Sequence, residues 1–90
     1  MNVPLSLYHL PTCPFCVKVR RAATALGVEL ALIDISRDPA ARQRLLDARG
    51  RATVPVLSIP SESGERLLPE SNDIVAFLNE VAATDQSSAA

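Results

Sequence analysis

The two cysteines of this chain lie three residues apart, in the tetrapeptide Cys13-Pro14-Phe15-Cys16. If Cys13 caps a helix, Cys16 lies about one turn later on the same face, and the two sulfurs can form and break a disulfide. The nucleophile in that exchange is a thiolate, which the free N–H groups at a helix N-terminus stabilise. We therefore expect Cys13 to be exposed, to have a lowered pKa and to attack first, and Cys16 to attack second and resolve the mixed disulfide.

Zinc binding and a permanent disulfide are the other chemical uses of such a pair. A structural zinc site needs four ligands, and the only other soft or nitrogen side-chain ligand in the sequence is His9, so we expect no metal. The N-terminus lacks the pattern of a secretory signal, and no apolar run approaches the ~20 residues that span a bilayer. We therefore predict a cytoplasmic protein without membrane association, where reducing conditions would keep opening a structural disulfide.

The residues around the cysteines predict a strand, a helix and a second strand. Residues 5–9 form a short, partly alternating run between two prolines. Residues 14–26 are expected to be helical, with Pro14 at the first position and Gly27 at the C-terminal stop. Residues 29–35 are rich in β-formers and are expected to pair parallel with the first strand. In the predicted helix over residues 14–26, the apolar residues at helical spacing are Phe15, Val19, Ala22, Ala23 and Leu26.

The second half predicts a helix, a hairpin and a last helix. Asp38 is expected to cap a helix that ends at Gly50, and residues 54–59 and 66–68 to form two strands joined by a turn over 61–64. Ser71 is expected to cap the last helix, with an apolar stripe formed by Ile74, Val75, Phe77, Leu78 and Val81. The expected fold is α/β, a four-stranded mixed sheet flanked by three helices in the order βαβαββα. Residues 1–83 form one domain, and residues 84–90 are expected to be a flexible tail.

The charge of the 90-residue chain is nearly balanced, with nine basic and ten acidic residues. Net charge therefore predicts no nucleic-acid partner. Residues 1–51 nevertheless hold eight basic and four acidic residues, and residues 52–90 hold one and six. The basic half is either a solvated face or the rim of an anion site. Lys18 and Arg20 follow the cysteines closely and are expected to help stabilise the Cys13 thiolate.

Three motifs in order resemble the glutaredoxin family of the thioredoxin fold. Cys13-Pro14-Phe15-Cys16 is similar to its dithiol motif, and Thr53-Val54-Pro55 is similar to its second signature. Leu68-Pro69-Glu70-Ser71 looks more like the third signature of glutathione-transferase N-terminal domains and transferase-like glutaredoxins. The resemblance extends from residue 5 to about residue 82.

The resemblance implies a glutathione site. It implies that the peptide bond before Pro55 is cis and that the backbone of Val54 pairs with the cysteinyl part of glutathione. Ser71 would bind the γ-glutamyl carboxylate and Glu70 its ammonium, as suits a hydroxyl at a helix N-terminus beside an acid. Arg51 is the candidate for the glycyl carboxylate. The supporting residues are Pro14, Phe15 and Thr53.

The function implied is glutathione-dependent thiol-disulfide exchange on glutathionylated or disulfide-containing proteins, by a monomer with glutathione as co-substrate. Two alternatives stay open. One is the carriage of an iron-sulfur cluster held by Cys13 and glutathione from two subunits. The other is thioredoxin-like disulfide reduction driven by a flavoprotein reductase, which the same fold permits because function resides in the site.

Overall fold

The computed structural model describes residues 5–62 and 64–89, with side chains described as far as Ala83. It contains four strands and three helices in the expected order βαβαββα. They are β1 (Leu5–His9), α1 (Pro14–Leu26), β2 (Leu30–Asp34), α2 (Pro39–Arg49), β3 (Val56–Ser61), β4 (Gly64–Pro69) and α3 (Ser71–Ala89). In the described part of the chain, no helix combines the length and the apolar character needed to cross a membrane.

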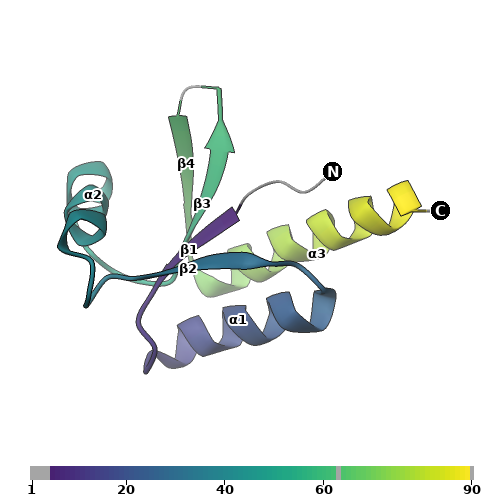
Figure 1. The fold of residues 1–90 in the computed structure, drawn as a ribbon, viewed down its shortest axis with the longest axis horizontal. Helices are drawn as coiled ribbons and strands as arrows, with labels where there is room; N and C mark the ends of the chain where they lie inside the picture. The colour runs from purple at the N-terminus through teal and green to yellow at the C-terminus, as the bar shows by residue number, and fades with distance from the viewer. Residues whose placement is uncertain (1–4, 63, 90) are drawn as a thin grey trace.

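The four strands form one mixed sheet in the order β2-β1-β3-β4. Strand β2 pairs with β1 in parallel, as expected for a βαβ unit, and β3 pairs antiparallel with both β1 and β4. Figure 1 shows α1 and α3 together on one side of the sheet and α2 on the other. This is the thioredoxin-like arrangement that the sequence predicted.

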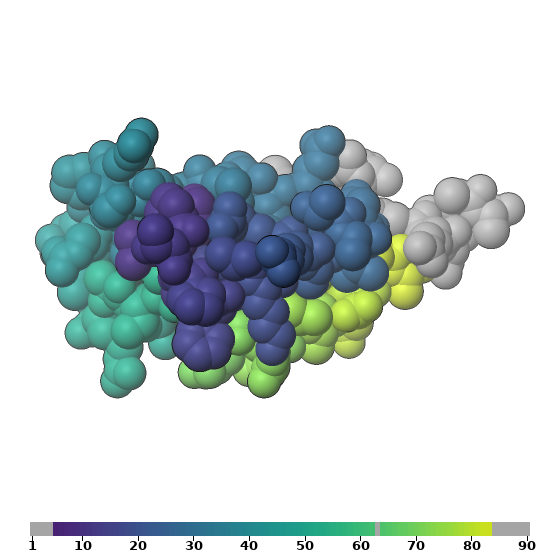
Figure 2. Space-filling view, turned by 90° about the horizontal axis from the view of Figure 1, so that it is seen from below, coloured from purple at the N-terminus to yellow at the C-terminus, as the bar shows by residue number. Residues whose placement is uncertain are grey.

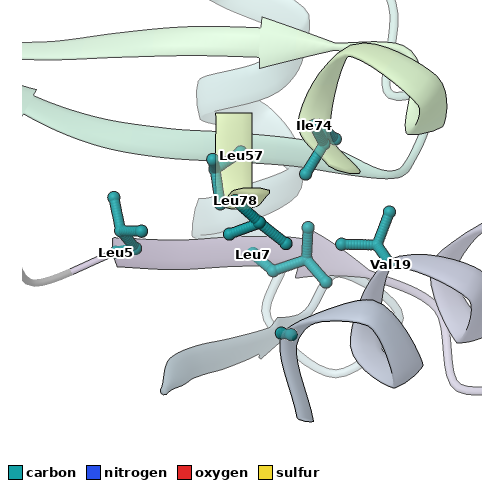
Figure 3. Packing of buried hydrophobic residues seen from close by; sticks show 7 residues of the cluster. Leu5, Leu7, Val19, Leu57, Ile74 and Leu78 are labelled. Carbon is teal, nitrogen blue, oxygen red and sulfur yellow. The ribbon is translucent and has the colours of Figure 1, made fainter. Parts of the chain in front are cut away.

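Each face of the sheet has its own apolar core. Figure 3 shows the larger one, in which side chains of β1 and β3 meet those of α1 and α3; its buried members are Leu5, Leu7, Val19, Ala23, Leu57, Ile74 and Leu78. The core on the α2 face is smaller, with Tyr8, Ile35, Ala41, Leu45 and Val56 buried. Burial of these apolar side chains holds the three helices on the sheet.

Local signals explain the ends of the first two helices. Cys13 is the extended N-cap of α1, with Pro14 as the next residue, and Gly27 ends the helix with a left-handed φ of 72°. Asp38 accepts a hydrogen bond from the Ala41 backbone N–H at 3.0 Å at the start of α2. Gly50 ends α2 with a φ of 74°. These are the roles predicted from residue type alone.

Several predicted element boundaries were wrong. Strand β2 spans Leu30–Asp34 and not residues 29–35. Strand β3 begins at Val56 and not at Val54, because Val56 is the first residue paired with β1 and β4. Strand β4 is longer than residues 66–68, since its pairing extends to the end of the hairpin. Ser71 is the first helical residue of α3, and the carbonyl of Glu70 accepts the first helical hydrogen bond, from Ile74 N–H at 3.0 Å. Helix α3 continues to Ala89; flexibility of residues 84–90 stays a prediction, because their side chains lie outside the described set.

A polar network on the α2 face was not predicted. The Tyr8 hydroxyl donates to the Glu65 carboxylate, 3.3 Å from each oxygen, and accepts from Arg44 Nε at 3.2 Å. The Arg44 guanidinium also lies 5.8 Å from the centre of the Tyr8 ring, and the Ser58 hydroxyl donates to Glu65. The network links α2 to three strands, and its members come from sequence positions too distant to show a pattern.

Candidate active site

Strand register brings the three sequence motifs to one end of the sheet. Val56, the first residue of β3, lies opposite Tyr8 near the end of β1 and opposite Pro69 at the end of β4. The residues just outside this row are therefore the loop to Cys13, the segment 53–55 and the start of α3. In Figure 2 the purple start of α1 borders the green surfaces that follow later in the chain.

Cys13 has the surroundings of an attacking thiol. Its side chain is half-buried, and its own backbone N–H donates to the Leu10 carbonyl at 3.1 Å, which fixes the loop before α1. Partial burial raises the pKa of Cys13, but hydrogen bonds from the Cys16 backbone, the Cys16 thiol and the Phe15 backbone outweigh it, so the pKa is lowered. The helix N-terminus therefore supplies the stabilisation, as predicted.

Cys16 differs sharply from Cys13. Its side chain is 0% exposed, and burial is the largest reason why the pKa of Cys16 is raised to about 11, with the neighbouring Cys13 adding to the rise. A buried thiol that keeps its proton does not compete for external substrates. This contrast supports the expected order, in which Cys13 attacks first and Cys16 follows.

The contrast can be measured by alkylation. We expect the rate of Cys13 carboxamidomethylation to reach its half-maximum at a pH below that of a free cysteine peptide, because only the thiolate reacts. Iodoacetamide labelling followed by mass spectrometry over a pH series measures this midpoint. The Cys16→Ala variant is the control, since it removes the hydrogen bond from the Cys16 side chain and should shift the midpoint upward. A midpoint equal to that of the free peptide would contradict the role given to the helix N-terminus.

Other side chains of the first motif take different positions from those expected. Phe15 is 61% exposed, and not part of the apolar stripe, because Cys16 and Val19 occupy the face of α1 that packs on the sheet. Lys18 Nζ donates to Asn72 Oδ1, which links α1 to the first turn of α3. Hydrogen bonds lower the pKa of Cys13, and neither Lys18 nor Arg20, which were expected to contribute, is among the causes of that shift.

The second motif reaches the same end of the sheet. The Val54–Pro55 peptide bond is cis, as the resemblance implied. Arg49 Nη1 donates to Thr53 Oγ1 at 3.1 Å, which ties the segment to the end of α2. Within the described residues no hydrogen bond engages the backbone of Val54, so its amide is free to pair with a ligand. Arg51 is exposed beside this segment.

The third motif begins α3 with an unusual backbone. Glu70 has a φ of 73°, a left-handed conformation that costs a residue other than glycine roughly 1–2 kcal/mol. Its side chain is exposed and that of Ser71 is partly exposed. Strained non-glycine residues concentrate at functional sites, and the first N–H groups of a helix bind anions. Both facts favour a ligand-binding role for this pair.

The burial of His9 was not predicted from the sequence, where this residue was considered only as a possible metal ligand. His9 is 5% exposed, and its Nδ1 has no hydrogen-bond partner within the described chain. Burial lowers the pKa of His9, the charge of Arg20 lowers it further, and Asp34 only partly opposes them. The signal was present, since Leu5, Leu7 and His9 alternate along β1 and alternate residues of a strand point to one face.

The neutral state of His9 predicts a pH dependence of stability. Its folded pKa lies below the unfolded value of ~6.5, so the unfolded chain binds a proton more readily. The free energy of unfolding should therefore be fully retained above pH ~6.5 and should fall as the pH drops below that value. Denaturant unfolding at a series of pH values tests this, with His9→Gln as the comparison. Because the chain has one histidine, identical pH profiles for the two proteins would contradict the prediction.

No group of three or more His, Cys, Asp and Glu side chains among the described residues could hold a metal ion. The candidate site consists of the cysteine pair, the segment 53–55 and the pair at residues 70–71. The fold and this candidate site define a thioredoxin-fold protein with a cysteine pair at the start of its first helix.

Comparison with known families identifies the group within that class. The sequence model of the family described as Glutaredoxin matches residues 5–63, well over half of the chain. The chain belongs to the glutaredoxin family. A search of curated protein sequences finds no match to it.

Solved structures show the same fold. A trimeric glutathione transferase of Leishmania is similar, with a TM-score of 0.71 and 28% identity over 86% of this chain and 17% of that one. A glutathione transferase of Bombyx mori has a TM-score of 0.70 and 28% identity, over 87% and 36%. The thioredoxin-like protein BC3987 has a TM-score of 0.64 and 28% identity, over 82% and 97%. The chain thus spans a minor part of the transferases that it matches. These likenesses and the family support a glutathione-related thiol oxidoreductase type of function.

Proposed function

We propose that this protein is a glutathione-dependent thiol-disulfide oxidoreductase that reduces protein-glutathione mixed disulfides and protein disulfides. The observation that carries the proposal is the difference between the two thiols. Cys13 is accessible and has a lowered pKa, whereas Cys16 is fully buried and its pKa is raised to about 11. This pair of thiols lies next to the segment 53–55, which has a free backbone amide, and next to residues 70–71 at the start of α3, where a carboxylate can bind. Such an arrangement fits thiol-disulfide exchange with glutathione better than a structural role for the cysteines.

In the monothiol route, the Cys13 thiolate attacks the glutathione sulfur of a mixed disulfide. The substrate disulfide breaks, and the protein thiolate leaves and takes up a proton, while glutathione becomes bonded to Cys13. A second glutathione thiolate then attacks the bound glutathione sulfur. Glutathione disulfide forms and Cys13 leaves as a thiolate, a step that a low-pKa thiol favours. In net, one free glutathione is consumed: its sulfur is oxidised, the protein sulfur is reduced to a thiol, and the glutathione of the mixed disulfide leaves within glutathione disulfide.

In the dithiol route, Cys13 attacks a protein disulfide and remains bonded to one of its sulfurs. The Cys16 thiolate then attacks Cys13, which releases the substrate thiol and leaves a Cys13–Cys16 disulfide for two glutathiones to reduce. Both routes need Cys13, and only the second needs Cys16.

Glutathione is proposed to lie across the three motifs. The backbone of Val54 pairs with its cysteinyl part, and Pro55 supports this segment. Ser71 and the N–H groups of the first turn of α3 bind the γ-glutamyl carboxylate, and Glu70 accepts from its ammonium. Arg51 binds the glycyl carboxylate. We also propose that the protein is cytoplasmic, since this chemistry requires a reducing glutathione pool. We further propose that it acts as a monomer.

The choice of electron donor tests the proposal. The wild-type protein is assayed for reduction of a glutathionylated peptide with glutathione and glutathione reductase, and in parallel with thioredoxin reductase. We expect turnover in the assay with glutathione and glutathione reductase, and none in the assay with thioredoxin reductase. Turnover only with thioredoxin reductase would replace the proposal by thioredoxin-like reduction. A brown protein with visible absorbance after anaerobic purification, inactive in both assays, would replace it by cluster carriage.

A further inference from the structure

Arg20 is a charged residue beneath the cysteines that the proposed mechanism does not yet use. It lies one turn after Cys16 on α1, and residues four apart share a helix face. Its Nη2 donates to the Pro11 carbonyl at 3.3 Å, so the guanidinium extends back toward the loop that carries Cys13. Its Nε is buried with no hydrogen-bond partner in the described part of the chain, where no carboxylate forms an ion pair with it either.

An uncompensated, partly buried cation is costly to folding. Asp34, the acid whose charge acts on His9, accepts a hydrogen bond from Ser36 and pairs with Arg37 at 3.9 Å, so it does not compensate Arg20. The charge of Arg20 also acts on His9, where burial and that charge lower the pKa of the imidazole. The positive charge of Arg20 is therefore available to an anion that forms next to it.

The Cys16 thiolate is such an anion. Burial is the largest cause that raises the pKa of Cys16, and the Leu10 backbone N–H and the charge of Arg20 lower it. When Cys13 is bonded to glutathione or to a substrate, its sulfur carries no charge and no longer acts on Cys16 as an anion. At that stage Arg20 is the one charged group among the described causes that favours the Cys16 thiolate.

We propose that Arg20 is a positioning residue for the resolving step, whose charge favours the Cys16 thiolate while its hydrogen bond to Pro11 holds the Cys13 loop against α1. In this step Cys16 gives its proton to solvent, and the thiolate attacks the Cys13 sulfur. The Cys13–Cys16 bond forms, the bond from Cys13 to glutathione breaks, and glutathione leaves as a thiolate. Cys16 is oxidised and the departing glutathione sulfur is reduced. The inference rests on the proposed function, because it concerns the second half of the dithiol route.

The test follows ring closure directly rather than turnover. Reduced protein is mixed with glutathione disulfide and quenched in acid at successive times, and mass spectrometry separates the glutathione adduct from the internal disulfide. We expect Arg20→Met to slow closure by about three- to tenfold near neutral pH, as when one nearby charge stops acting on a buried thiolate. Its pH profile should move to higher pH, and Arg20→Lys should restore most of the rate. Arg21→Met is the matched control, since Arg21 is the exposed neighbour on α1.

Each outcome separates this inference from the function on which it rests. Closure at the wild-type rate in Arg20→Met would overturn it. A slowing of closure that is equal at all pH values and is not relieved in Arg20→Lys would also overturn it. That result would mean that Arg20 acts only through its hydrogen bond to Pro11 and not through its charge. Failure of the wild-type protein to form either the glutathione adduct or the Cys13–Cys16 disulfide would instead overturn the proposed function, and this inference with it.

Discussion

Replacing Cys13 by serine is expected to lower the glutathione-coupled activity by about 10³-fold or more, because both routes begin with the Cys13 thiolate and a serine hydroxyl does not ionise near neutral pH. The assay is reduction of a glutathionylated peptide coupled to glutathione reductase. Cys13 is half-buried at the start of α1, and a serine hydroxyl is a preferred helix N-cap that can accept hydrogen bonds from the same backbone N–H groups, so the substitution should leave the fold intact. Circular dichroism checks that point.

Cys16→Ser is the matched control for this experiment. The buried side chain is replaced by one of similar size, and the monothiol route should survive within a few-fold because it does not use Cys16. Reduction of a protein disulfide that requires the dithiol route should fall strongly in the same variant. Equal loss of deglutathionylation in both serine variants would contradict the assignment of Cys13 as the attacking residue.

Replacing Leu7 by alanine is expected to reduce the free energy of unfolding by about 2–5 kcal/mol, the range for deleting a buried leucine side chain. Leu7 is fully buried in the centre of the sheet, where it pairs with both Leu32 and Leu57 and packs in the core formed with α1 and α3. Small domains have only ~5–15 kcal/mol of stability in total. Denaturant titration at constant pH measures the loss.

The matched control is Leu32→Ala, which removes the same atoms from the neighbouring strand. Leu32 is 49% exposed on the edge strand β2, so little apolar area returns to water and the loss should stay below ~1 kcal/mol. Similar losses in the two variants would show that the core on the α1 and α3 face does not provide the main stabilisation.

The elements with local signals could be predicted closely. Helices α1 and α2 begin beside prolines and end at glycines, and a proline or glycine acts on its own backbone whatever the tertiary fold. Strand β3 was misplaced because Val54 favours a strand by residue type, whereas strand bounds depend on pairing with β1 and β4. Pairing is set by the whole sheet, which no local window contains.

The site divides in the same way. The cysteine pair could be predicted because both residues lie in one tetrapeptide whose spacing defines their chemistry. The left-handed Glu70 could not, since nothing in its residue type favours that conformation. The roles of His9 and Arg20 depend on the packing of α1 on β1, which brings Arg20 close enough to act on both His9 and Cys16.

The position of Tyr8 gives this protein an intrinsic optical probe. The chain has one tyrosine and no tryptophan, so its aromatic emission comes from a single buried side chain other than the weakly emitting phenylalanines. That side chain contacts Arg44 of α2 and Glu65 of β4, so its fluorescence depends on whether both elements are docked on the central strand. Opening of the α2 face can therefore be followed without a label, separately from the redox state of the cysteines on the other side of the sheet.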